Sequence, residues 1–83
     1  MDALDGNAIA GALFEHFGHE MTMAQVRCLH CQSTTMIAEL RVYMKAAGAV
    51  ARCPACEEVV MVIVNVRDTD RFDMSNMEMV SPA

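Results

Sequence analysis

The four cysteines of this chain form two matched Cys-x-x-Cys pairs. Cys28 and Cys31 make the first pair, Cys53 and Cys56 make the second, and 21 residues separate the two pairs. Two residues between cysteines allow a tight turn to direct both sulfurs at one ion, and two such turns complete a tetrahedron of thiolates. A closed set of four thiolates leaves no open coordination position, so we expect a structural metal and no hydrolytic centre. The pattern predicts Cys28, Cys31, Cys53 and Cys56 as metal ligands and indicates no catalytic residue.

Other roles of these cysteines are also compatible with the pattern. Four unligated thiols are one alternative, and a pair of Cys-x-x-Cys disulfides is another. A catalytic thiol–disulfide centre at Cys53 and Cys56 would need a helix that begins at the second cysteine in a thioredoxin-like βαβ unit. The segment EEVV at residues 57–60 reads instead as the start of a strand. We favour a metal, although the gap between the pairs exceeds the usual zinc spacing of about 15–20 residues by one.

Thiolates bind both zinc and iron, so the identity of the metal must be argued from other residues. The Cys-Pro-Ala-Cys at residues 53–56 resembles the second knuckle of rubredoxins, which hold one iron with four cysteines and pass single electrons. Rubredoxins, however, carry an aromatic core and small residues after their knuckles. Aromatic residues make up 5% of this chain, and Gln32 and Glu57 follow its two knuckles. We expect zinc, with iron at the same cysteines as the alternative.

The residues that flank the cysteines bear on how each turn is built. The position after the second cysteine often takes a positive φ, which glycine adopts most easily, yet Gln32 and Glu57 stand there. Backbone N–H groups in each turn are expected to point at the sulfurs and to moderate their charge. Arg27 and Arg52 precede the two pairs and either add to this compensation or face solvent at strand ends.

The three histidines are weaker candidates for metal binding. His16 and His19 are three residues apart near the end of a predicted helix, where they could share a second ion. Solvated histidines that interact favourably with the helix dipole are the more common case. His30 lies inside the first knuckle and is expected to point to solvent.

Nine methionines are many for a chain of 83 residues. Flexible thioethers fill irregular cores and also form adaptable binding surfaces. We expect Met36, Met44 and Met61 in the core. A second group is a candidate docking patch for a partner: Met74, Met77 and Met79. Residues 75–83 form a Met-rich tail that we expect to fray.

Composition and charge limit the classes of function. The chain is 54% hydrophobic and short, so it is expected to form a single domain, residues 1–83, that recruits a metal for stability. Its formal net charge of −5 becomes −7 once four thiols ionise and one divalent ion binds, which disfavours binding to nucleic acid. We expect no contact with a membrane, because there is no secretion signal and the longest apolar run, Val59 to Val64, is too short. Paired cysteines without a signal favour the reducing cytoplasm.

The elements that must position the cysteines follow from the periodicity. Residues 1–18 are predicted to form a helix with one apolar stripe, Asp2 and Asp5 near its start and Gly18 at its left-handed end. Residues 21–74 are predicted to form a zinc ribbon. Its strands are expected at Thr35–Lys45, Ala49–Arg52, Val59–Val66 and Arg71–Met74, the last at an edge.

The strand at Val59–Val66 has apolar residues on both faces, which is typical of a central strand covered on both sides. The ribbon itself accounts for one cover. The N-terminal helix or a second subunit would supply the other, so a homodimer is one expectation. The predicted fold class is α+β: an N-terminal helix packed on a small antiparallel zinc-ribbon sheet.

Four segments carry a family likeness: residues 1–11 (MDALDGNAIAG), the step FG…EMT at 17–22, AELRVY at 38–43 and RCPAC at 52–56. Over about residues 1–75 the chain resembles a family of short bacterial zinc-ribbon proteins of unknown function. The resemblance implies that the four cysteines are metal ligands, and it implies no catalytic residue.

These observations favour a non-enzymatic, zinc-stabilised binding module for a protein partner. A rubredoxin-like electron-transfer protein that acts with an oxidoreductase is the alternative. Nucleic-acid binding through the ribbon is the third reading, and the acidic composition disfavours it.

Overall fold

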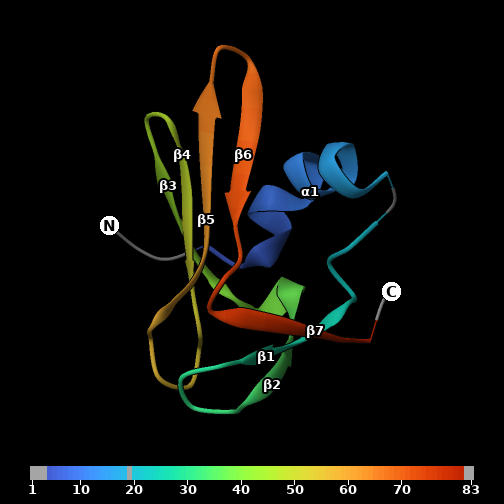
Figure 1. Cartoon of the computed structure of the whole chain (residues 1–83), viewed down its shortest axis with the longest axis vertical. Helices are drawn as coiled ribbons and strands as arrows, with labels where there is room; N and C mark the ends of the chain where they lie inside the picture. The colour runs from blue at the N-terminus through green and yellow to red at the C-terminus, as the bar shows by residue number, and fades with distance from the viewer. Residues whose placement is uncertain (1–3, 19, 82–83) are drawn as a thin grey trace.

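Two antiparallel sheets and one α-helix make up the part of the chain that this computed structural model describes, residues 4–18 and 20–81. A four-stranded sheet has the order β3-β4-β5-β6, and a three-stranded sheet has the order β2-β1-β7. Figure 1 shows the three-stranded sheet crossing below the four-stranded one, with α1 beside β6. The fold class is α+β, as predicted. The strands are β1 (Gln25–Cys28), β2 (Thr34–Met36), β3 (Arg41–Lys45), β4 (Gly48–Arg52), β5 (Val59–Val66), β6 (Thr69–Asp73) and β7 (Met77–Ser81).

The N-terminal helix is shorter than the prediction of residues 1–18. A 3-10 turn, η1 (Gly6–Ile9), leads into α1 (Ala10–Phe17). Leu4 precedes both and forms an isolated antiparallel bridge with Val42 of β3. The backbone of Leu4 is therefore hydrogen-bonded to the edge strand of the four-stranded sheet, which prevents the helix from starting earlier.

Both ends of this helical segment have the caps that the sequence predicts. The Asp5 side chain accepts a hydrogen bond from the Asn7 amide at 3.0 Å, which satisfies a free donor of the first turn. Gly18 takes a left-handed φ of 81° and its amide donates to the Phe14 carbonyl at 2.7 Å. Asp2 lies outside the described residues.

The predicted strand Thr35–Lys45 is wrong in its middle. The 3-10 turn η2 (Ile37–Glu39) separates β2 from β3, so the two halves of this segment belong to different sheets. The Glu39 carboxylate accepts a hydrogen bond from the Met36 amide at 3.1 Å and caps the turn. Ile37 is fully buried, and its amide donates to the Ala24 carbonyl. These long-range contacts override the alternating pattern.

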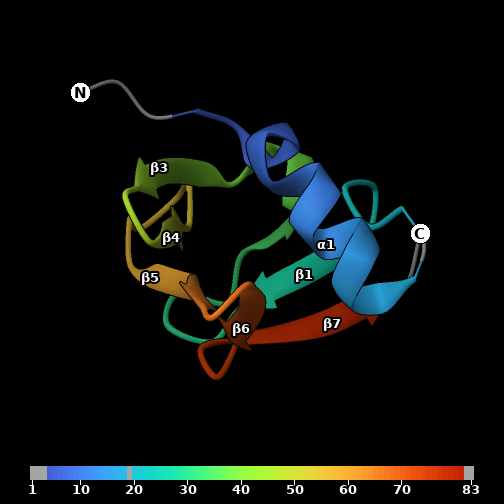
Figure 2. The ribbon, with the colours of Figure 1, turned by 90° about the horizontal axis from the view of Figure 1, so that it is seen from above.

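Only one face of the four-stranded sheet is covered by the described elements. In Figure 2 the helix α1 and the strands β1 and β7 all lie on one side of β3–β6. Five residues that point to that side are buried: Val42, Ala49, Ala51, Met61 and Ile63. On the other side, Val62 of β5 is half-buried, and Val64 and Val66 are exposed. The prediction that the N-terminal helix supplies the second cover of β5 is therefore wrong, and a second subunit on this face stays a prediction.

The Met-rich tail, expected to fray from residue 75, forms β7 and pairs with β1. Cys28 lies opposite Met77, and Val26 lies opposite Met79. Met77 is 7% exposed and belongs to the core. The docking patch proposed from Met74, Met77 and Met79 is thus wrong for Met77. Met79 remains exposed, and Met74 packs partly buried against the core.

One hydrophobic cluster lies between the helix and the two sheets. Ile9 and Leu13 of the helical segment enter it, whereas Phe14 of the same segment is half-exposed. Met61 is buried as predicted, but Met44 is exposed. Among the described residues, no helix is long and apolar enough to cross a membrane.

Candidate metal centre

The four cysteines converge from two different sheets. Cys28 is the last residue of β1 and Cys31 lies in the turn that follows, whereas Cys53 and Cys56 lie in the turn between β4 and β5. All four Sγ atoms lie within 4.8 Å of one another. The first cysteine of each pair is buried and the second is partly buried. The structure therefore brings together all four residues that the sequence selects.

The two knuckles have the same backbone geometry. In the first, the Cys28 carbonyl accepts from the Gln32 amide at 2.8 Å, and the Cys28 amide donates to the Ser33 carbonyl at 2.9 Å. In the second, Cys53 makes the equivalent bonds with Glu57 at 2.8 Å and Glu58 at 2.9 Å. Equal hydrogen bonds produce two turns that present their sulfurs in the same way.

Positive φ angles close both turns without glycine. Gln32 has a φ of 68° and Glu57 has a φ of 64°, so the expectation for this position is confirmed. A left-handed conformation is costly for residues other than glycine, and it persists only where the surroundings impose it. The strain at Gln32 and Glu57 indicates that the shape of the knuckle is required at both positions.

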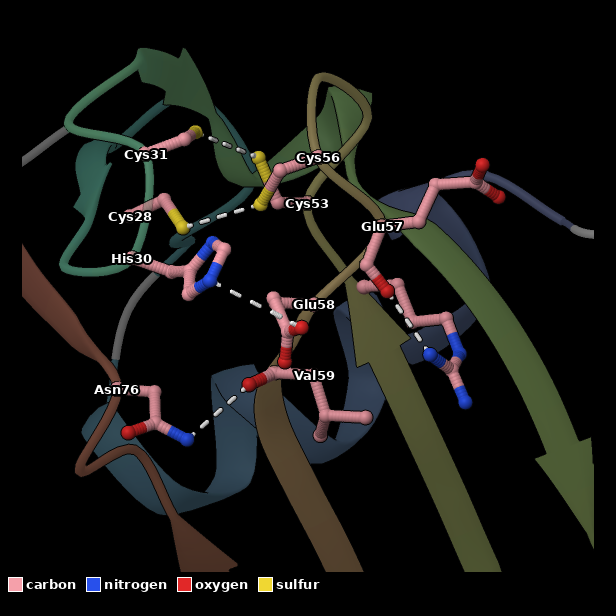
Figure 3. Close-up of polar contacts among 10 residues, drawn as sticks. Cys28, His30, Cys31, Cys53, Cys56, Glu57, Glu58, Val59 and Asn76 are labelled. Atoms are coloured by element: carbon pink, nitrogen blue, oxygen red, sulfur yellow. Dashed lines mark hydrogen bonds and ion pairs between the residues drawn. The ribbon is translucent and has the colours of Figure 1, made fainter.

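The sulfur positions fit a tetrahedral ion. The Sγ atoms of Cys28 and Cys56 lie 3.7 Å apart, as do those of Cys31 and Cys53. Figure 3 shows that each of these contacts joins one knuckle to the other. A tetrahedron with metal–sulfur bonds of about 2.3 Å has sulfur–sulfur edges of about 3.8 Å. The donor set can therefore hold one thiophilic ion, and when bound the ion would supply a cross-link between the two turns.

The thiols differ in their readiness to ionise. Hydrogen bonds from the Ser33 hydroxyl and amide lower the pKa of Cys31 to about 6. The Glu58 amide lowers the pKa of Cys56, but burial and the three neighbouring thiols outweigh it and raise that pKa to about 12. One thiolate thus forms easily, and a further one resists because like charges are close together. A metal cation that replaces the thiol protons would offset the repulsion between the thiolates.

Backbone groups, rather than arginines, surround the sulfurs. The Ala55 amide points at Cys53 Sγ from 3.4 Å. Arg27 forms an ion pair with Glu78 of β7, and Arg52 donates to the Glu57 carbonyl at 2.8 Å. The hydrogen bonds and ion pairs described for both arginines thus go to oxygen atoms, so the expectation that they compensate the thiolates receives no support.

Asn76 is a supporting residue that the sequence analysis missed. Its carbonyl accepts from the Leu29 amide at 3.0 Å, and its side-chain amide donates to the Val59 carbonyl at 3.2 Å. Asn76 thereby ties the first knuckle to the start of β5, directly after the second knuckle (Figure 3). Its position just before a Met-rich segment gave no sign of this role, which depends on β7 being a strand.

The histidines take no part in the cysteine cluster. His30 is exposed, as expected, with Nε2 at 4.0 Å from the Glu58 carboxylate. His16 stacks on Phe72 of β6 with ring centroids 4.2 Å apart. His19 lies outside the described residues. Within the described chain, the cysteines form the only group of three or more His, Cys, Asp or Glu side chains placed to share an ion.

Comparison with known proteins gives a family but no activity. The chain belongs to DUF6510, a family of unknown function whose model matches residues 1–82. The predicted membership in a family of unknown function is therefore confirmed. No curated protein and no solved structure matches the chain.

Proposed function

We propose that this protein is a zinc-stabilised binding module for a protein partner and that it is not an enzyme. The position of the four thiols carries this proposal. Two ligands come from the three-stranded sheet and two from the four-stranded sheet, so one ion would join the sheets. No strand of one sheet makes extensive backbone contact with the other sheet in the described chain, which makes this link important for stability.

The closed ligand set supports a structural role for the ion. Four protein thiolates complete the usual tetrahedral shell, so no position remains for a water or a substrate. The scarcity of aromatic residues and the absence of small residues after the knuckles favour zinc over iron. Free thiols of this kind are kept reduced in the cytoplasm, where we place the protein.

Metal analysis of the untagged protein tests the first half of the proposal. We expect one zinc per chain by elemental analysis and no absorbance in the visible spectrum. A chelator should unfold the protein, as measured by circular dichroism, because the free energy of metal binding contributes to the free energy of folding. One iron per chain with thiolate charge-transfer bands would overturn the proposal in favour of electron transfer.

A matched pair of variants controls for damage to the knuckle. Cys31→Ser removes one predicted ligand and should abolish stoichiometric zinc. Leu29→Ser changes an exposed residue of the same turn and should retain it. Loss of zinc in both variants would show that the turn is merely fragile, and retention in both would refute the four-cysteine site.

Photo-crosslinking in cells tests the second half. A photoreactive residue would replace exposed side chains on separate surfaces, such as Phe14, Met23 and Val64. We expect a discrete protein adduct from at least one position, and its loss when Cys31→Ser is added. The absence of any adduct at every position would overturn the partner-binding role.

A further inference from the structure

The four-stranded sheet has one uncovered face, which we call the open face. Strand register places three aligned rows of side chains on it: Arg41 beside Arg52, Tyr43 beside Val50 and Val62, and Lys45 beside Gly48, Val64 and Arg71. Figure 2 shows these strands on the side of the molecule away from α1, β1 and β7. Val64 is 39% exposed, whereas Ile63, which points to the other side, is buried.

The open face concentrates positive charge in an acidic protein. It carries four of the chain's six lysines and arginines: Arg41, Lys45, Arg52 and Arg71. With the carboxylates of Glu57 and Asp73 its formal charge is +2, which leaves two cations and nine carboxylates, or −7, for the rest of the chain. Such segregation creates a strong local potential that attracts anions to this face.

These cations are not neutralised within the described chain. No described carboxylate lies at ion-pair distance from Arg41, Lys45 or Arg71. The Asp73 carboxylate accepts hydrogen bonds from the Ser75 amide at 3.1 Å and from its hydroxyl at 2.8 Å. Asp73 is therefore engaged in a turn beyond the end of β6.

Two adjoining hollows give the open face a shape. One, of about 380 Å³, is lined by Tyr43, Lys45, Val50, Arg52 and Glu57. The other, of about 130 Å³, is apolar and lies around Gly48, with walls that include Val50, Val62 and Val64. Lys45 and Val50 border both hollows. A cationic hollow and an apolar hollow thus stand next to each other along β4.

The second knuckle holds the central cation in place. Arg52 donates to the carbonyl of Glu57, the residue with the left-handed φ after Cys56, and its guanidinium lies 5.9 Å from the centre of the Tyr43 ring. A guanidinium held by such contacts loses less entropy when it binds a carboxylate. The ion that orders the knuckle would therefore also order part of the open face.

We propose that the open face binds an extended acidic segment of a partner protein, in which a carboxylate and an apolar side chain stand two residues apart. This rests on the partner-binding role proposed above. Gly48 and Val50 line the apolar hollow, and Val50 and Arg52 line the cationic one, so the linings are offset by two positions along β4. In a strand this offset is about 7 Å, which equals the spacing of residues i and i+2 in an extended peptide. The carboxylate lies between Lys45 and Arg52, and the apolar side chain enters the hollow at Gly48.

Charge decides against the other occupants. A second copy that met this face with its own would oppose two surfaces of charge +2, with like charges directly across the interface. A nucleic acid would extend past the face onto the rest of the chain, whose formal charge of −7 repels a polyanion. A short acidic segment meets only the positive region, and its apolar side chains match the valines.

Peptide binding to the full-length, zinc-loaded protein tests this inference by fluorescence anisotropy. The probe is a labelled synthetic peptide of about nine residues. Its odd-numbered positions are glutamate and leucine by turns, and its even-numbered positions are all serine. Peptides with lysine for glutamate, or serine for leucine, and an oligothymidylate of equal charge serve as comparisons. We expect only the first peptide to bind, and to bind more weakly as salt is raised from about 0.05 to about 0.3 M.

Two charge-reversal variants locate the site. Lys45→Glu should weaken binding about fivefold or more, because an attraction to the carboxylate becomes a repulsion. Arg67→Glu makes the same type of change at the tip of the β5–β6 hairpin and should alter binding less than about twofold. Zinc content and the unfolding midpoint, measured on each variant, separate lost binding from lost folding.

The outcomes are distinct from those of the proposed function. Absence of binding by the acidic peptide, equal effects of the two charge reversals, or tighter binding of the oligothymidylate would each overturn the inference. Dimerisation of the wild type through this face, detected by sedimentation and abolished by Val64→Asp, would do so too. If zinc content and a crosslink from Phe14 or Met23 persist in these cases, the proposed binding module is retained, and only the assignment of the open face as its binding surface is overturned.

Discussion

Met77→Ala should destabilise the protein far more than Met79→Ala. Both methionines lie on β7 and are exchanged for the same residue, but Met77 is 7% exposed and Met79 is 40% exposed. Truncation of a buried methionine to alanine lowers the free energy of unfolding by about 2–5 kcal/mol. Because β7 is an edge strand, it can move to fill part of the cavity, so we expect a loss of about 2–3 kcal/mol here. For a domain of this size the loss lowers the unfolding midpoint by about 10–20 °C. Met79→Ala should cost less than about 1 kcal/mol.

Thermal unfolding at one fixed concentration of free zinc measures the difference, because bound metal adds to the apparent stability. Met77 lies opposite Cys28 in the β1–β7 register, so the same substitution should also speed the transfer of zinc to a chromogenic chelator. Unfolding of both variants within a few degrees of the wild type would contradict the importance of Met77 for stability. Greater damage from Met79→Ala would contradict it too, since burial would then not explain the role of β7.

Two further predictions concern glycine and pH. Gly48→Ala should cost about 2 kcal/mol or more in urea unfolding, because its Cβ would lie 1.9 Å from the Ile63 carbonyl oxygen. Gly11→Ala, where nothing lies within 4 Å of the new Cβ, should instead stabilise α1 by about 0.5–1 kcal/mol; an equal effect of the two would contradict the packing. Zinc affinity should fall as pH falls, because the metal-free thiols, with Cys56 at a pKa of about 12, take up the protons that zinc displaces. The fall should steepen below about pH 6, where Cys31 also takes up a proton, and competition titrations that show no dependence on pH would contradict this.

The candidate site could be read from the sequence because its determinants are local. Each Cys-x-x-Cys turn forms its own hydrogen bonds, from Cys28 to Gln32 and from Cys53 to Glu57. The spacing within each pair is enough to predict how one turn presents two sulfurs. Each turn also follows a strand, β1 before the first pair and β4 before the second, and the sequence predicts the strand at Ala49–Arg52.

The remaining errors arise where distant contacts decide the local structure. Alternation over Thr35–Lys45 predicts one strand, but Ile37 is drawn into the core and its amide bonds to Ala24, which creates the turn η2. The tail after residue 75 lacks a strong periodic pattern. It becomes β7 because β1 offers a free edge and a buried place for Met77. Neither partner is adjacent in the sequence, so propensity alone could not predict these outcomes.

The uncovered side of β5 links these errors to function. A run of apolar residues such as Val59–Val66 indicates burial on both faces, yet the described chain buries only one. The pattern predicts two covers, and the described residues supply one of them. The open face, on the uncovered side of β5, carries four of the six lysines and arginines of an acidic protein. The second knuckle orders part of it through the hydrogen bond from Arg52 to Glu57. If the two proposals above hold, a metal that stabilises the second knuckle would also order part of the surface proposed to bind a partner, because Arg52 of that surface is hydrogen-bonded to Glu57.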